Sequence, residues 1–128
     1  MPNREQIHCI VVKAIAGLAS ATTGTVTSAS LDTQGFDSAA FNLSYGATAP
    51  APTSITVEDS DNNSDWASAA STSVVDDGGT HAVSTTRRIA YVGPKRYCRV
   101  VVVLSASTIL TITGMLGYPQ TAPTTNPV

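Results

Sequence analysis

The sequence contains little charge. Only 12% of its 128 residues are charged, and the formal net charge is −2. Neither sign of charge therefore forms the broad field that would steer the protein to nucleic acid or to an anionic membrane. Long apolar runs are also absent, because Lys13 interrupts the apolar segment 7–19, which is too short to span a bilayer. We accordingly expect neither nucleic acid nor a membrane among the partners of this chain.

Cysteine is scarce as well, with Cys9 and Cys98 as the two examples. Both have apolar neighbours and neither belongs to a metal-ligand motif, so we expect buried thiols that act as small apolar side chains. A disulfide between the two is the alternative. The first residues lack the strongly basic segment of a secretory signal, which favours synthesis in a cytoplasm, where thiols stay reduced.

The abundant residues are Ala, Ser, Thr and Val, accompanied by 9 Gly and 7 Pro. This composition favours strands and turns, and no amphipathic segment of helical length is visible. Counting the short apolar and alternating segments predicts about seven or eight strands, spaced as in an antiparallel β-sandwich or jelly roll. We expect one all-β domain over residues 7–118. Residues 1–6 and the Pro/Thr-rich residues 119–128 are predicted to form extended N- and C-terminal arms.

Where apolar and polar residues alternate, the apolar positions predict which face of a strand is buried. Residues 36–45 form one such strand, and 54–59 another, preceded by a proline-containing loop. Residues 86–116 are predicted to form an antiparallel meander of three strands. The expected core-facing residues are Ala39, Phe41, Leu43, Tyr45, Ile55, Val57, Cys98, Val100, Val102, Leu104, Leu110, Ile112, Gly114 and Leu116.

The segment "VEDSDNNSDW" places acidic and amide side chains at alternate positions, which suggests a calcium loop. The candidate metal ligands are Asp59, Asp61, Asn63 and Asp65. An EF-hand is excluded, because Ser64 stands where the loop needs glycine and Ala70 where it needs a bidentate glutamate. We expect a strand-connecting turn without a metal, since Asp and Asn hydrogen-bond their own backbone. A looser calcium site that includes Asp76 or Asp77 is the alternative.

Other side chains that could carry chemistry are few. Trp66 is expected to anchor the next strand in the core, with stacking on a sugar as the alternative. His8 and Cys9 point to opposite faces of a strand and cannot form a dyad, and no serine lies in a G-x-S-x-G motif. A pairing of His81 with a distant Ser or Cys is the alternative. We therefore expect no enzyme, no catalytic residue and no cofactor.

Most basic residues lie within the predicted meander, close to two tyrosines. Because the chain is acidic overall, this cluster favours a protein interface over a nucleic-acid site. Solvated charges that guard a hairpin are the alternative. The candidate interface residues are Arg87, Arg88, Lys95, Arg96, Tyr97 and Arg99, with Pro119, Pro123 and Pro127 of the C-terminal arm.

Two motifs resemble a group of small virion proteins of tailed bacteriophages. In that group a strand ends in a Ser-Asp-Asp/Asn-Asn-Ser-x-Trp/Phe turn, and Gly-x-Lys-Arg-Tyr later leads into a Val-rich strand and a Gly-x-Pro tail. The resemblance covers mainly the second half of the chain. The matching residues are Ser60, Asp61, Asn62, Asn63, Ser64, Trp66, Gly93, Lys95, Arg96, Tyr97, Gly117 and Pro119.

The resemblance implies a head decoration or cement protein. Such a subunit would bind the major capsid protein on the outside of the head shell, after assembly in the host cytoplasm. It would also contact further copies of itself, as a dimer or a trimer. The alternatives are another phage structural protein, of the neck or tail, and a carbohydrate- or calcium-dependent β-sandwich binding module.

Overall fold

The structure is a computed structural model that describes residues 10–17, 22–47, 52–78 and 81–119. These residues form ten strands and one short 3-10 helix, Ser71–Ser73. No helix among them has the length and apolar character needed to cross a membrane. The strands are β1 (Ile10–Gly17), β2 (Thr22–Thr27), β3 (Leu31–Asp32), β4 (Phe36–Tyr45), β5 (Pro52–Ser60), β6 (Ala67–Ser68), β7 (Val74–Asp76), β8 (Thr86–Tyr91), β9 (Tyr97–Thr108) and β10 (Leu110–Pro119).

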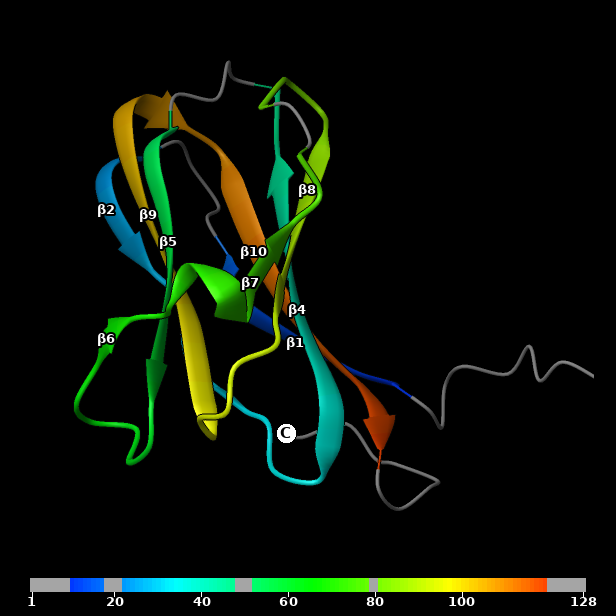
Figure 1. Cartoon of the computed structure of the whole chain (residues 1–128). Helices are drawn as coiled ribbons and strands as arrows, with labels where there is room; N and C mark the ends of the chain where they lie inside the picture. Colours follow the sequence, from blue (N-terminus) through cyan, green and yellow to red (C-terminus); the bar gives the residue numbers. More distant parts are fainter. Residues whose placement is uncertain (1–9, 18–21, 48–51, 79–80, 120–128) are drawn as a thin grey trace, which may run out of the picture.

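The strands form two antiparallel sheets that face each other (Figure 1). Sheet A has the order β1-β10-β4-β8-β7. Sheet B has the order β2-β9-β5-β6, and β3 also pairs with β9. The all-β sandwich that the composition predicted is confirmed, and eight of the strands are three residues or longer.

The strand pairs are nested along the chain. β1 pairs with β10, β2 with β9, β4 with β8, and β5 with β6. Pairing of β10 with β4 and of β9 with β5 then closes the two sheets. This pattern is a long antiparallel hairpin rolled into two sheets, which is the topology of a jelly roll.

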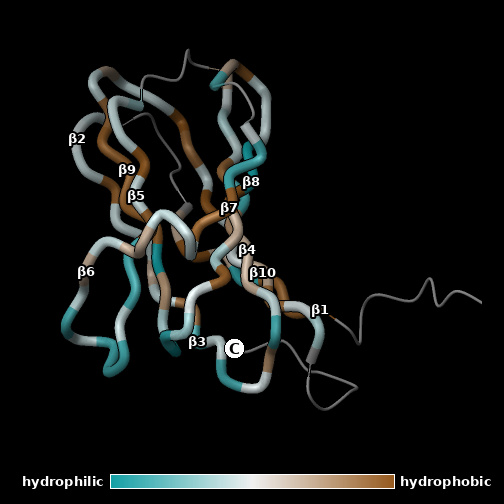
Figure 2. The backbone as a smooth tube through the Cα atoms, in the orientation of Figure 1, coloured by the Kyte–Doolittle hydropathy of each residue, from teal (hydrophilic) through white to brown (hydrophobic). Residues whose placement is uncertain are grey.

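The core lies between the sheets and is built from alternate residues of the long strands. The predicted inward faces of β4, β9 and β10 are confirmed: every expected residue on them is buried. Val57 is buried and Ile55 packs against the same core. Hydrophobic residues follow β9 and β10, whereas hydrophilic residues gather in the β5–β6 turn (Figure 2).

The predicted meander is wrong. β8 and β10 belong to sheet A and β9 belongs to sheet B, so neither pair of consecutive strands is hydrogen-bonded as a hairpin. The chain instead crosses from one sheet to the other after Tyr91 and again at Ile109. Turn residues such as Gly93 and Pro94 suit such a crossing as well as a hairpin, because they fix only the local backbone direction.

The prediction that Pro52 lies in a loop is also wrong. It is the first residue of β5 and opposes Leu104, with an irregular register between Pro52 and Ser54. Proline is tolerated at the first position of a strand, where a missing amide donor costs little.

Candidate interaction surface at the terminal end

β1 begins and β10 ends at the same end of the sandwich, which we name the terminal end. Ile10 opposes Gly117, and Pro119 opposes Phe36 at the start of β4. Pro119 is therefore the last residue of β10, although the sequence assigned it to the C-terminal arm. Residues 1–6, with Pro123 and Pro127, lie outside the described residues. The β3–β4, β5–β6 and β8–β9 connections lie at this end too (Figure 1).

The β3–β4 turn is fastened to the β8–β9 loop. The backbone N–H of Thr33 donates to the carbonyl of Arg96 at 2.9 Å, and its hydroxyl donates to the same oxygen at 2.7 Å. Within the turn, Gln34 N–H donates to Asp32 Oδ1 at 3.0 Å, and Gly35 has φ of 87°. The left-handed backbone explains the glycine. The β3–β4 turn and the β8–β9 loop therefore form one unit.

An ion pair also joins these two loops. Arg96 Nε lies 2.9 Å from Asp32 Oδ1, and Arg96 Nη2 lies 2.7 Å from Asp32 Oδ2. This two-point contact holds the pKa of the Asp32 carboxyl below its ordinary value of 3.8. The Arg96 guanidinium also lies over the Tyr97 ring, 4.9 Å from its centroid. Arg96 and Tyr97, two predicted interface residues, are therefore held in place at the terminal end.

The terminal end is hollowed on both sides of Phe36. A groove of about 510 Å³ runs between residues 33–37 and residues 93–96. A cavity of about 260 Å³ opens between β1, β3 and β10. Gln34 lines both, and its side chain is exposed. A partner that covered this end would thus meet two adjacent depressions.

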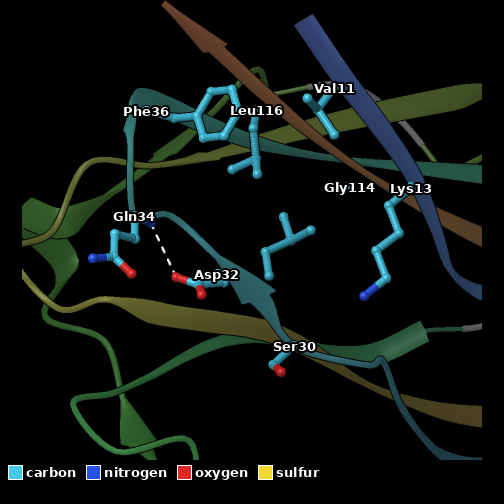
Figure 3. Close-up of a pocket in the computed structure, with 9 residues that line it drawn as sticks. Val11, Lys13, Ser30, Asp32, Gln34, Phe36, Gly114 and Leu116 are labelled. Carbon is cyan, nitrogen blue, oxygen red and sulfur yellow. Dashed lines mark hydrogen bonds between the residues drawn. The ribbon is translucent and has the colours of Figure 1, made fainter. Parts of the chain in front are cut away.

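The cavity has an apolar wall and a polar rim (Figure 3). Val11, Leu31 and Leu116 supply apolar surface, while Lys13 and Asp32 supply one charge of each sign. The volume is smaller than that of a typical site for a drug-sized ligand. It suits a single anchoring side chain from a protein partner, the kind of contact that dominates interface energies.

Asp59 connects the two sheets beneath the terminal end. It lies on β5 and is only 5% exposed. The Tyr91 hydroxyl, from β8, donates to Asp59 Oδ2 at 3.0 Å, and Lys95 Nζ lies 3.2 Å from Oδ1. The backbone N–H of Lys95 donates to the Tyr91 hydroxyl at 3.2 Å. Burial raises the pKa of Tyr91 to about 12, so the hydroxyl keeps its proton as a donor.

Gly93 is required by the same network. A Cβ atom at this position would lie 2.5 Å from the Tyr91 hydroxyl oxygen. The loop can therefore pass over the buried tyrosine only as glycine.

The acidic segment forms a turn built around Asn62. Its Oδ1 accepts hydrogen bonds from the backbone N–H groups of Ser64 at 2.9 Å and Asp65 at 2.8 Å. Its Nδ2 donates to Asp65 Oδ2 at 2.7 Å, and Asn63 has φ of 59°. Local side-chain hydrogen bonds and a left-handed residue thus explain the composition of the turn.

The four candidate metal ligands do not converge. Asp59 points into the protein, whereas Asp61, Asn63 and Asp65 are exposed on the turn. Within the described ranges, no group of three or more His, Cys, Asp or Glu side chains is arranged to hold a metal ion.

Trp66 lies outside the core, so its predicted role as a core anchor is wrong. The residue is half-buried, and the Arg99 guanidinium lies over its ring, 4.2 Å from the centroid. Arg99 also pairs with Glu58 at 2.7 Å. This cluster lies on the outer face of sheet B. Because Arg99 covers one face of the indole, only the other is left for stacking on a sugar.

Arg87 and Arg88 lie on β8, away from the terminal end. Arg87 contacts Asp76 and His81, and Arg88 Nε lies 3.4 Å from Asp77 Oδ2. Each of the predicted basic interface residues therefore has a carboxylate partner within the described part of the chain. The sequence cluster is divided in space among the terminal end, the outer face of sheet B and the far end of sheet A.

Sequence reasoning missed the depressions around Phe36 and the Asp59–Tyr91 contact. Lys13 could have indicated the cavity, because a lone charge within an apolar strand often marks the edge strand of a sheet. No comparable signal marked the second, because Asp59 and Tyr91 are separated by 32 positions.

Comparisons with known proteins give no family assignment. A scan against protein-family models, a search of curated proteins and a search of solved structures each found no match.

Proposed function

We propose that the protein is a structural virion subunit of the decoration or cement type, which binds the head shell of a tailed bacteriophage through its terminal end. One observation carries this proposal: the start of β1, the end of β10 and both depressions around Phe36 lie together at that end. The jelly-roll topology supports it, because viral capsid domains often use this fold.

The charge distribution of the terminal end fits a protein partner. Two of its basic side chains form ion pairs, Arg96 with Asp32 and Lys95 with Asp59. Asp61 and Asp65 are exposed on the β5–β6 turn at the same end. This end therefore combines fixed ion pairs and exposed carboxylates with one cavity whose wall is apolar, which is the mixed composition of a protein interface. A modest contact of this kind gains avidity when copies that are joined to each other bind neighbouring sites of a lattice at the same time.

Co-sedimentation with purified heads tests the proposal. Gln34→Arg places a bulky charge at the rim of both depressions, and we expect it to weaken binding by about tenfold, equivalent to about 1.4 kcal/mol. Removal of residues 1–6 or 120–128 is expected to weaken binding as well. Purified tails serve as a second bait, since binding to tails alone would indicate a neck or tail protein.

Ala106→Arg is the matched control, because Ala106 is exposed on β9 at the opposite end of the sandwich. We expect this variant to bind heads as the unmodified chain does. Loss of binding by Ala106→Arg with full binding by Gln34→Arg would place the contact at the wrong end and overturn the proposal.

A further inference from the structure

The outer face of sheet A carries an apolar row that crosses all five strands. The strand registers place Val12 opposite Met115, Met115 opposite Ala40, Ala40 opposite Ala90, and Ala90 opposite Val75. The chain neighbours of these residues, such as Val11, Phe41 and Ile89, point into the core. The row itself therefore faces outward. Val12 is 41% exposed and Val75 is 56% exposed.

The same face has little charge. The next outward row contains Ala14, Thr113 and Asn42 on β1, β10 and β4. The charged residues of this face are Arg88 and Asp77, which form an ion pair near β7. The solvent side of an antiparallel sheet normally alternates polar residues with the buried ones. A flat apolar row at these positions is instead typical of a surface that another protein covers.

We propose that a second copy of this chain covers the row, related by a two-fold axis that runs parallel to β4 above Ala40. This rotation reverses the order of the strands. Val12 of one copy then faces Val75 of the other, Met115 faces Ala90, and Ala40 faces its own counterpart. The longest side chain of the row thus meets one of the smallest, and the two β-branched ends meet each other. An isologous interface requires a surface that is complementary to a second copy of itself, and this row meets that requirement when its order is reversed.

The available area suits a dimer of modest affinity. Five strands at about 4.8 Å and three outward rows at about 6.8 Å give a face of roughly 24 by 20 Å. Two such faces bury roughly 1,000 Å² of projected area, near the lower end for specific protein interfaces. The small side chains at the centre of the row allow the two sheets to approach closely.

This inference is independent of capsid binding. The terminal end, with its depressions and charge pairs, is the surface proposed for the shell, and the outer face of sheet A is a different surface. Either proposal can fail without the other, because the following experiment contains no capsid.

Sedimentation of the full chain at concentrations from about 1 to about 500 µM tests the dimer, a range chosen for an interface of this size. We expect the mass to double as the concentration rises. Ala40→Arg and Ala40→Glu should each remain at the monomer mass, because the axis brings two like charges together. An equimolar mixture of the two variants should restore the doubled mass, since an Arg and a Glu then face each other across the axis.

Thr56→Arg is the matched control, because Thr56 lies on the outer face of sheet B opposite Val101. This variant should dimerise like the unmodified chain, and circular dichroism should show that all variants are folded. A monomer mass for the unmodified chain at every concentration would overturn the inference. So would a trimer, failure of the mixture to restore the dimer, or loss of the dimer in Thr56→Arg alone.

Discussion

At the scale of single residues, Asp59 holds together groups from both sheets. Its carboxylate on β5 accepts the hydroxyl hydrogen bond of Tyr91 from β8 and pairs with the Lys95 ammonium. All three groups lie at the terminal end, and Lys95 belongs to the β8–β9 loop. Loss of the carboxylate would leave the buried Tyr91 hydroxyl without its acceptor, whereas the Lys95 ammonium, 36% exposed, can be hydrated. An unsatisfied buried donor costs more than the loss of an exposed ion pair.

We expect Asp59→Ala to lower the free energy of unfolding by about 2 kcal/mol, the cost of leaving the buried Tyr91 hydroxyl without its acceptor. Urea denaturation followed by circular dichroism measures this. Asp61→Ala is the control, because Asp61 is exposed on the adjacent turn and should change stability by less than about 0.5 kcal/mol. Equal effects of the two substitutions would show that the buried network contributes nothing.

His81 lies among hydrogen-bonding side chains at the end of sheet A opposite the terminal end. Its Nδ1 lies 2.6 Å from the Tyr45 hydroxyl, and its Nε2 contacts the Arg87 guanidinium, which also pairs with Asp76. The guanidinium has only donors, so Nε2 accepts and the proton resides on Nδ1. Burial, followed by the nearby Arg87 charge, lowers the pKa of His81 below its ordinary value of 6.5.

This lowered pKa predicts a loss of stability on acidification. Near neutral pH the imidazole is uncharged in both states. As the pH falls through 6.5, the unfolded chain takes up the proton more readily than the folded protein, so the free energy of unfolding decreases. Urea titrations at pH 7.5, 6.5 and 5.5 should show this slope, and His81→Gln should reduce it. The lowered pKa values of Asp32 and Asp76 act only below about pH 4, outside this window. An unchanged slope in His81→Gln would exclude this residue as the cause.

At the scale of elements, the contact between β10 and β3 depends on the absence of one side chain. Gly114 on β10 lies against Leu31 on β3, and a Cβ at position 114 would lie 2.5 Å from Leu31 Cδ2. Leu31 and Gly114 also line the cavity at the β1 edge. The glycine thus lets a leucine from sheet B fill the space against sheet A.

Gly114→Ala is therefore expected to destabilise the protein by about 1–3 kcal/mol, the usual cost of overpacking a core. Gly117→Ala on the same strand is the control, because its Cβ would find ordinary contacts at 3.8 Å. Leu31→Ala removes the clash, so the double variant with Gly114→Ala should be more stable than the sum of the two single effects. Thermal or urea melts of the four proteins complete this double-mutant cycle, and strict additivity would disprove the steric explanation.

The elements also show what local sequence determines. The inward faces of β4, β9 and β10 were predictable, because alternation of apolar and polar residues follows directly from the geometry of a single strand. The assignment of strands to sheets was not, since β8, β9 and β10 all have an apolar inward face and neither Gly93 nor Ile109 specifies a crossing.

For the candidate site, the basic cluster was visible in the sequence. Its ion pairs were not, because a partner such as Asp32 is 64 positions from Arg96.

At the scale of the whole molecule, nesting of the strands predicts that the core opens as a single cooperative unit. The first described strand, β1, pairs with the last, β10, and every strand pair between them is enclosed by this one. Access to the middle of the core should therefore require separation of the two sheets. Cys98 reports on this directly, because it lies on the inward face of β9 and its side chain is fully buried.

Burial raises the pKa of the Cys98 thiol to about 12, so the folded protein contains almost none of the reactive thiolate near neutral pH. A Cys9→Ser variant leaves Cys98 as the single thiol. We expect a thiol reagent to modify this variant at least about a thousandfold more slowly in buffer than in denaturing urea, because modification has to wait for global opening. Destabilising the core by Gly114→Ala should then speed modification in proportion to the lost stability, whereas Gly117→Ala should not. Fast modification of the folded Cys9→Ser variant, insensitive to Gly114→Ala, would mean that the sheets separate locally at β9 and that the nested pairs do not act as one unit.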